Sequence, residues 1–159
     1  KFSSLENVTI LHPKSQGSAK EWPIEKYMSL ALKLSQEGKT VVFTGTDSEG
    51  AKLRGHIPSH QNCVDTTGKL SLEQLMVLIS KANNLVACST GPLHIAGYYG
   101  INTIGLFSPK RPIHPGRWKA LGKNVNIVVF DENCKPCSNG KDCFCIEDIE
   151  VDRVYKQIK

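Results

Sequence analysis

The sequence predicts an α/β fold in which helices cover both faces of a Rossmann-like parallel sheet. Short apolar runs of strand length alternate with segments whose apolar residues recur at helical spacing. Polar loops that contain glycine follow several of these runs, as in the βα units of a parallel sheet. With 159 residues and 40% hydrophobic content, the chain is long enough for one core, so we expect residues 1–159 to form a single domain.

Six short runs rich in β-branched and apolar residues predict the strands. They comprise residues 8–11, 40–44, 63–65, 85–88, 102–107 and 126–130. Such runs are typical of strands that are buried on both faces of a parallel sheet. Right-handed crossovers would place the carboxyl end of every strand, and the polar loop after it, along one edge of the sheet.

A polar loop from His12 to Trp22 leads into the first predicted helix. Pro23 suits the start of a helix and Gly38 is a stop signal. The core-facing stripe between them consists of Ile24, Tyr27, Met28, Ala31 and Leu34.

Two more helices are expected before the fourth strand. A short one follows the loop at residues 45–49, and another opens at Ser71, where Gln74 completes the signature of a capping box. The buried face of this second helix is expected to consist of Leu72, Leu75, Met76, Ile79 and Ala82.

The fourth strand runs into Ser89-Thr90-Gly91-Pro92-Leu93-His94-Ile95-Ala96, which predicts a turn from strand to helix. Thr90 suits the N-cap, Pro92 lies near the first helical position, and Gly91 permits close approach to the backbone. Unpaired amides at a helix start, together with the positive end of the helix dipole, bind anions such as phosphate. The alternative is an ordinary βα turn in which His94 is packed or solvated.

The last third of the chain contains two segments without a predicted regular element. Residues 108–118 are rich in proline and basic residues, and either bind phosphate through Lys110 or Arg111 or form a surface excursion. A final helix is expected at residues 149–158, with its apolar positions docked on the fold.

Residues 131–147 form a Cys-rich loop that holds four of the six cysteines, namely Cys134, Cys137, Cys143 and Cys145. A CxxC pair followed closely by CxC leaves three states open: a structural zinc site, a disulfide, or reduced thiols. The two other cysteines lie in predicted strands, which favours a reducing compartment.

The composition disfavours several classes of protein. The net charge of +5 suits anionic ligands, but the basic residues are scattered and lack the aromatic pattern of a nucleic-acid binder. No apolar run reaches the roughly 20 residues of a membrane span, and the polar sequence after residues 1–4 predicts no signal peptide. The chain has neither a Walker lysine motif nor GxGxxG, which disfavours P-loop kinases and dinucleotide binders.

Four polar loops are therefore expected to share one ligand site at the carboxyl edge of the sheet. The candidate binding residues are Ser15, Lys20, Thr46, Glu49, Ser89, Thr90, Gly91 and His94. Helix amides with Lys and His would offset phosphate charge, and the carboxylate of Glu49 would accept hydrogen bonds from ribose hydroxyls. The alternative for Glu49 and Lys20 is an exposed charge on a helix surface.

Motifs in order over nearly the whole chain resemble glycosyltransferase family nine, the ADP-heptose:lipopolysaccharide heptosyltransferases. The most specific, Ser89 to Ala96, is similar to the family's Asp-[Thr/Ser]-Gly-x-x-His-x-Ala, although Ser89 stands where many members have Asp. The other matching segments are the basic loop before Trp22-Pro23, Gly45 to Glu49, Gly68 to Leu72, Gly105 to Pro109, and the late Cys-x-Pro-Cys.

The resemblance implies one half of a GT-B fold, the C-terminal half that binds the nucleotide sugar. It implies Ser15 and Lys20 near phosphate and Glu49 at the ribose, with the Thr90-Gly91 turn and His94 near the diphosphate. The catalytic base of the family is an aspartate of the N-terminal, acceptor-binding half, so no residue of this chain is given that role. The loop from His12 also looks one residue longer than in some relatives, which leaves the choice of phosphate contact within it open.

The resemblance therefore implies an inverting glycosyltransferase that binds an ADP-sugar, with ADP-heptose as the expected donor, for transfer to a lipopolysaccharide-core acceptor. Direct displacement at the anomeric carbon requires neither a metal nor an organic cofactor. The expected partners are the donor, the acceptor and an N-terminal domain, and the expected location is the cytoplasm, including the inner face of the inner membrane. Two alternatives remain: a non-catalytic nucleotide-binding module and a zinc-stabilised interaction domain.

Overall fold

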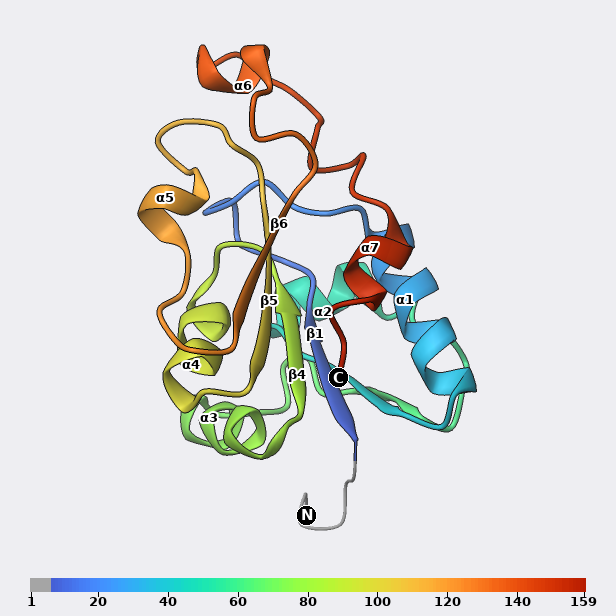
Figure 1. Cartoon of the computed structure of the whole chain (residues 1–159). Helices are drawn as coiled ribbons and strands as arrows, with labels where there is room; N and C mark the ends of the chain where they lie inside the picture. The colour runs from blue at the N-terminus through green and yellow to red at the C-terminus, as the bar shows by residue number, and fades with distance from the viewer. Residues whose placement is uncertain (1–6) are drawn as a thin grey trace.

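A computed structural model describes residues 7–159 of the protein (Figure 1). The start of the chain, where no signal peptide is expected, falls outside the described residues. The strands are β1 (Val8–His12), β2 (Thr40–Phe43), β3 (Cys63–Asp65), β4 (Asn84–Ala87), β5 (Asn102–Phe107) and β6 (Val125–Val129). The helices are α1 (Ile24–Gln36), α2 (Asp47–Leu53), α3 (Leu72–Lys81), α4 (Gly91–Tyr99), α5 (Pro115–Trp118), α6 (Lys135–Ser138) and α7 (Val151–Tyr155).

The strands form one parallel sheet in the order β3-β2-β1-β4-β5-β6, which confirms the predicted fold class. The chain first winds outward from β1 to β3 and then returns to continue from β4 to β6. The direction of winding therefore reverses between β1 and β4, where Ile10 pairs with Leu85. In open sheets of this kind, ligands bind at the carboxyl ends of the strands beside that reversal.

Each face of the sheet packs against its own set of helices. Alternate strand residues face opposite sides, so that Leu11 belongs to one core and Ile10 to the other. The first core includes residues of α1, α2 and α7, and the second includes residues of α3 and α4. Figure 1 shows α1 and α7 on one side of the strands and α3 and α4 on the other. This arrangement leaves the loops at the strand ends free to form a site.

The predicted buried face of α3 is wrong at its first residue. The capping box of Ser71 and Gln74 forms as expected, but the side chain of Leu72 is 62% exposed. The first turn of α3 borders a cavity at the carboxyl edge of the sheet, so its side chains line that cavity instead of the core. Leu78 is buried against the sheet in place of Leu72.

The last third of the chain contains short helices where the sequence predicted none. In residues 108–118, Pro115 starts α5, whose backbone amides at Arg117 and Trp118 both donate to the carbonyl of His114. In the Cys-rich loop, residues 135–138 form α6. Proline supports both helix starts, because its fixed φ suits the first turn.

The final helix, Val151–Tyr155, is shorter than the predicted 149–158, and Ile149 lies before its N-cap Glu150. Ile149 is held instead by side chains of α1 and of the loop that precedes α1. The carbonyl of Ile149 accepts hydrogen bonds from Trp22 Nε1, at 2.9 Å, and Lys26 Nζ, at 3.0 Å. Ile149 is nevertheless fully buried, as is Val154 within α7, so the predicted docking of this segment is confirmed. Within residues 7–159, no helix has the length and apolar character that crossing a membrane requires.

Candidate functional site

The loops after β1, β2 and β4 meet in a cavity of about 270 Å³ at the reversal of the sheet. It is lined by His12, Lys14, Ser15, Gln16, Ser18, Thr46, Glu49, Thr90, Gly91 and Pro92. Five of the eight predicted binding residues lie in this lining, contributed by three separate loops. The expected convergence of these loops is therefore found in the structure.

Two larger cavities adjoin this one along the same edge. A cavity of about 450 Å³ shares Ser18, Thr90 and Gly91 with it and continues toward α5. A cavity of about 350 Å³ shares His12 and Thr46 and continues toward the start of α3. Because neighbouring cavities share lining residues, the three lie side by side along the carboxyl edge of the sheet, and together they are called the groove.

The start of α4 presents its backbone to the middle of this groove. Thr90 is the N-cap, as predicted, but its hydroxyl donates to the carbonyl of Cys88, at 3.3 Å, and caps no amide of the helix. Pro92 has no N–H, and the amide of Leu93 donates to the Thr90 carbonyl, at 3.1 Å. A Cβ built on Gly91 would have no neighbour within 4 Å. The first turn of α4 therefore offers the Gly91 amide and the positive end of the helix dipole to an anion.

Thr46 and Glu49 form a capping box at the start of α2, which the sequence reasoning missed although the spacing Thr-x-x-Glu is its signature. Glu49 Oε2 accepts hydrogen bonds from the Thr46 amide, at 2.7 Å, and from the Thr46 hydroxyl, at 3.1 Å. The side chain of Glu49 is buried at the groove wall and not exposed on a helix surface. One carboxylate oxygen thus holds the loop after β2, while the other accepts no hydrogen bond from the described residues.

Ser15 is buried in the loop after β1, where Glu21 organises the backbone. Glu21 Oε1 accepts from the Ser15 amide, at 2.8 Å, and from the Ser15 hydroxyl, at 2.9 Å, while Glu21 Oε2 pairs with Lys14. Burial raises the pKa of Glu21, but the hydrogen bonds from Lys14 and Ser15 outweigh it and leave that pKa below its usual value. The ionised carboxylate therefore fixes the loop that forms one wall of the groove.

Lys20 is the predicted site residue that the structure does not bring to the groove. Its ammonium group lies 3.1 Å from Asp142 Oδ1 in the Cys-rich loop, and Lys110 lies 2.8 Å from the same oxygen. Lys110, one of the two residues considered for phosphate binding in residues 108–118, thus pairs with the same carboxylate as Lys20. Arg111 borders a separate cavity beside α5.

Ser89 and His94 line the 450 Å³ cavity, opposite residues that the sequence reasoning did not select. Its far wall consists of Pro112, Ile113, Arg117 and Trp118, from the segment that ends in α5. Ser18 Oγ lies 3.5 Å from the carbonyl oxygen of Ser89 and so brings the loops after β1 and β4 together across the reversal. Arg117 and His94 make this part of the groove suitable for negatively charged or polar groups.

His12 is a further groove residue: the sequence predicts it to begin the loop, but in the structure it is the last residue of β1. Its Nδ1 lies 2.9 Å from the Thr44 hydroxyl, and its ring is buried. Burial lowers the pKa of His12 more than the nearby carboxylates of Glu49 and Glu21 raise it. The neutral ring therefore supports the groove floor. Its position directly after a predicted strand is the feature of the sequence that could have identified it as a groove residue.

Metal-ligating side chains come together at a different place. Among residues 7–159, the group with suitable geometry consists of the four cysteines of the Cys-rich loop. None of them lines the three cavities of the groove.

The comparisons with known proteins match most of the chain. Residues 2–145 match the family model described as glycosyltransferase family 9 (heptosyltransferase). A lipooligosaccharide heptosyltransferase 2 of Campylobacter jejuni is 27% identical over 91% of this chain and 48% of its own length. The lipopolysaccharide core heptosyltransferase OpsX of Haemophilus influenzae is 30% identical over 94% of this chain and 47% of its own length.

Solved structures show the same fold. The ADP-heptose lps heptosyltransferase II of E. coli superimposes with a TM-score of 0.78 at 23% identity, over 98% of this chain and 46% of that one. The E. coli heptosyltransferase WaaC with ADP also gives 0.78, at 17% identity, over 97% of this chain and 44% of that one. The chain therefore spans about half the length of the curated relatives it matches.

Proposed function

This chain belongs to glycosyltransferase family 9, and we propose that it is the donor-binding part of a heptosyltransferase, with ADP-heptose as the nucleotide sugar. The observation that carries the proposal is the row of three adjoining cavities at the reversal of the sheet, which offers an apolar pocket, a carboxylate and a helix start in that order. A nucleotide sugar has matching parts in the same order: a base, a ribose, a diphosphate and a sugar.

Each part of the groove suits one part of the donor. The 350 Å³ cavity has apolar walls from Leu70, Leu72 and Leu75, which suit the flat faces of a nucleobase. The free oxygen of Glu49 suits the ribose hydroxyls. The start of α4 at Gly91 suits the diphosphate. The 450 Å³ cavity would then hold the sugar, beside His94 and Arg117.

In the proposed reaction, a hydroxyl of the acceptor attacks the anomeric carbon of the sugar from the side opposite to the diphosphate. The bond from that carbon to the diphosphate breaks, and the configuration at the carbon is inverted. The Gly91 amide, the α4 dipole and the cations of the groove stabilise the charge that develops on the leaving diphosphate. This scheme uses neither a metal nor an organic cofactor.

The acceptor and the base that removes its proton are proposed to be held by sequence outside this chain, because the chain covers about half of its relatives. By the same proposal the acceptor is a lipopolysaccharide core, and the enzyme works in the cytoplasm or at the inner face of the inner membrane. The alternative is a nucleotide-binding module without catalysis. A single nucleotide site with no sugar transfer by the longer protein would favour that alternative.

The proposal is tested by isothermal titration of the protein with ADP, UDP and GDP. We expect ADP to bind most tightly and His94→Ala to weaken its binding, because the imidazole would no longer line the phosphate and sugar part of the groove. His56→Ala is the matched control, since His56 lines none of the three cavities. Equal binding of all three nucleotides, or no binding by the folded full-length protein at millimolar concentration, would contradict the proposal.

A further inference from the structure

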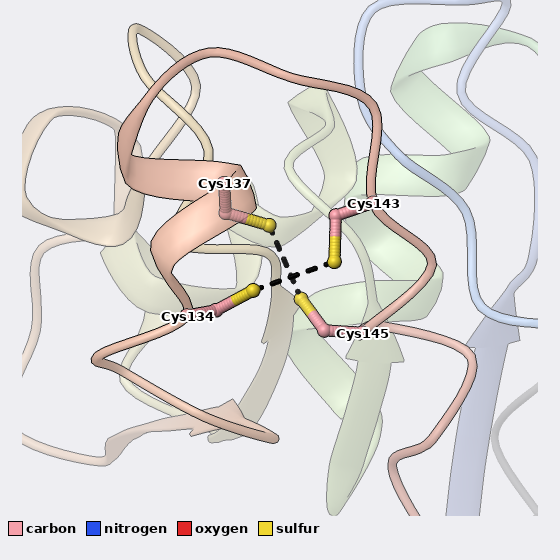
Figure 2. A group of neighbouring side chains, drawn as sticks. All are labelled: Cys134, Cys137, Cys143 and Cys145. Carbon is pink, nitrogen blue, oxygen red and sulfur yellow. Dashed lines mark hydrogen bonds between the residues drawn. The ribbon is translucent and has the colours of Figure 1, made fainter.

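We propose that Cys134, Cys137, Cys143 and Cys145 together bind one zinc ion. All four sulfur atoms lie within 4.8 Å of one another. Cys134 Sγ lies 3.4 Å from Cys143 Sγ, and Cys137 Sγ lies 3.4 Å from Cys145 Sγ. Figure 2 shows the four side chains pointing toward a common centre, with the two sulfur pairs crossing. This site is separate from the donor groove and does not depend on the proposed function.

The spacing of the sulfurs fits a tetrahedral ion. Zinc bound by four thiolates at about 2.3 Å places every pair of sulfurs about 3.8 Å apart. The observed range, from 3.4 Å to no more than 4.8 Å, brackets this value. All four cysteines are free thiols in the structure, and a sulfur that approaches three others at once is arranged for coordination and not for one disulfide partner. Four soft sulfur ligands in a tetrahedron favour zinc over hard cations such as calcium or magnesium.

The backbone holds the two halves of the site in place. Cys134 precedes α6 and Cys137 lies in its single turn, which is closed by the Ser138 amide donating to the Cys134 carbonyl at 3.0 Å. The Gly140 amide then donates to the Cys137 carbonyl, at 3.0 Å, and turns the chain back. That reversal brings the second half of the site, from Cys143, over the first (Figure 2).

A hydroxyl group outside the loop supports two of the sulfurs. Ser108, which follows β5, is buried with its Oγ 3.3 Å from Cys137 Sγ and 3.8 Å from Cys145 Sγ. The Lys110 amide donates to the same Oγ at 3.2 Å, which leaves the hydroxyl proton available for a sulfur. Hydrogen bonds of this kind orient metal ligands and are typical of structural sites.

The packing of the loop gives an independent reason for an ion. Cys134, Cys137 and Cys145 form a buried cluster separate from the two cores of the sheet, and its partly buried member is Cys143. A cluster made of thiols alone has little apolar surface to bury and is a weak core. A structural zinc ion would supply the folding free energy that such a loop lacks.

The ion would also fix a contact next to the groove. Asp142 directly precedes Cys143 and pairs with Lys20, in the loop after β1, and with Lys110, after β5. Figure 1 places α6 beyond the carboxyl ends of the strands, on the same side as these loops. A zinc-bound loop would therefore hold Asp142 against two cations from the loops after β1 and β5.

The test is the metal content of the full-length protein, purified under reducing conditions without a chelator. We expect about one zinc per chain by mass spectrometry of the digested protein, with X-ray absorption showing four sulfurs at about 2.3 Å. The double variant Cys137→Ser/Cys145→Ser is expected to retain no zinc. Cys63→Ser is the matched control, because this partly buried thiol of β3 lies outside the cluster and its loss should leave the zinc content unchanged.

If the double variant does not fold, the test uses two other measurements. These are the X-ray absorption spectrum of the unmodified protein and the zinc content of the single variant Cys143→Ser, at the partly buried position. Removal of zinc by a chelator should open residues 131–147 to proteolysis before the sheet, since their cluster is separate from both cores. The proposal is overturned by a folded, reduced protein that neither contains nor takes up zinc. It is equally overturned by iron in the site, by disulfides among the four cysteines under these conditions, or by full zinc content in the double variant.

Discussion

Glu49 has two separable roles in our interpretation, and two substitutions distinguish them. Glu49→Gln keeps an oxygen that can replace Oε2 in the capping box, since Gln serves in this motif as Glu does. It removes the charge that we assign to the ribose. Glu49→Ala removes both the oxygen and the charge. If the assignment is right, the first variant loses affinity for ADP without losing stability, and the second loses both.

The expected magnitudes follow from the hydrogen bonds. A bond to a charged group contributes about 1.5–3 kcal/mol and a neutral one about 0.5–1.5 kcal/mol. Replacing two charge-assisted bonds to ribose by neutral ones, a loss of about 1 kcal/mol each, should therefore weaken ADP binding about thirtyfold in Glu49→Gln. Complete loss of the two bonds, about 3 kcal/mol or more in total, should weaken it by about a hundredfold or more in Glu49→Ala. Loss of the capping box, with its 2.7 Å bond to the Thr46 amide, should lower the free energy of unfolding by about 1 kcal/mol in Glu49→Ala alone.

The assay combines calorimetric titration with ADP and urea unfolding of the same three proteins. Unchanged ADP affinity in Glu49→Gln would refute the ribose assignment and leave Glu49 as a capping residue only. Equal losses of stability in both variants would refute the argument that one oxygen is sufficient for the cap.

Three further changes test the groove and the fold around it. Gly91→Ala should leave the thermal midpoint nearly unchanged, because the added Cβ meets nothing within 4 Å. The same methyl group should weaken ADP binding, because it fills the groove at the α4 start. Unchanged titration isotherms would contradict this. Gly50→Ala should lower the free energy of unfolding by about 1–3 kcal/mol, because its Cβ would lie 2.1 Å from Thr67 Oγ1. Denaturant unfolding measures this loss. A variant as stable as the wild type would show that Thr67 can move away from the added methyl group without cost. Burial lowers the pKa of His12 in the folded protein, so below pH about 6.5 the unfolded chain binds more protons than the folded one. The contribution of neutral His12 to stability is therefore present above that pH and lost as the pH falls. The slope of unfolding free energy against pH, between about 7 and 5, should flatten in His12→Gln, and an identical slope would argue against a depressed pKa.

The fold was predictable because its signals are local. Buried strands of a parallel sheet are short apolar runs, and the stop at Gly38 and the cap at Ser71 act within one turn of their helices. The same is true of the α4 start, where Thr90 is the N-cap as the sequence predicts. The handedness of crossovers predicted that the polar loops lie along one edge of the sheet, but the order of the strands was not predicted.

The remaining features depend on contacts between distant parts of the chain. Lys20 and Asp142 are 122 positions apart, and spacing alone gives no sign that they meet. Leu72 has the helical spacing of a core residue, but the position of α3 against the sheet leaves its first turn at the groove. The CxC half of the cysteine cluster gave an ambiguous signal, because four thiols become a site only when a turn brings two pairs face to face. Periodicity reports which face of a helix is apolar, not how far that helix extends past the sheet.

The position of Lys20 is compatible with a phosphate contact once the strength of its present pairing is considered. Asp142 is largely exposed, and its single oxygen is shared between Lys20 and Lys110. Exposed ion pairs contribute little, because water screens the charges and two long side chains lose freedom. The pair of lysines carries one more positive charge than Asp142 neutralises, so it attracts an anion. A diphosphate at the α4 start, bordered by Ser18 of the same loop as Lys20, would compete with one carboxylate for a cation that is only weakly held. We therefore expect Lys20 to exchange partners when the donor binds, with Asp142 retaining Lys110.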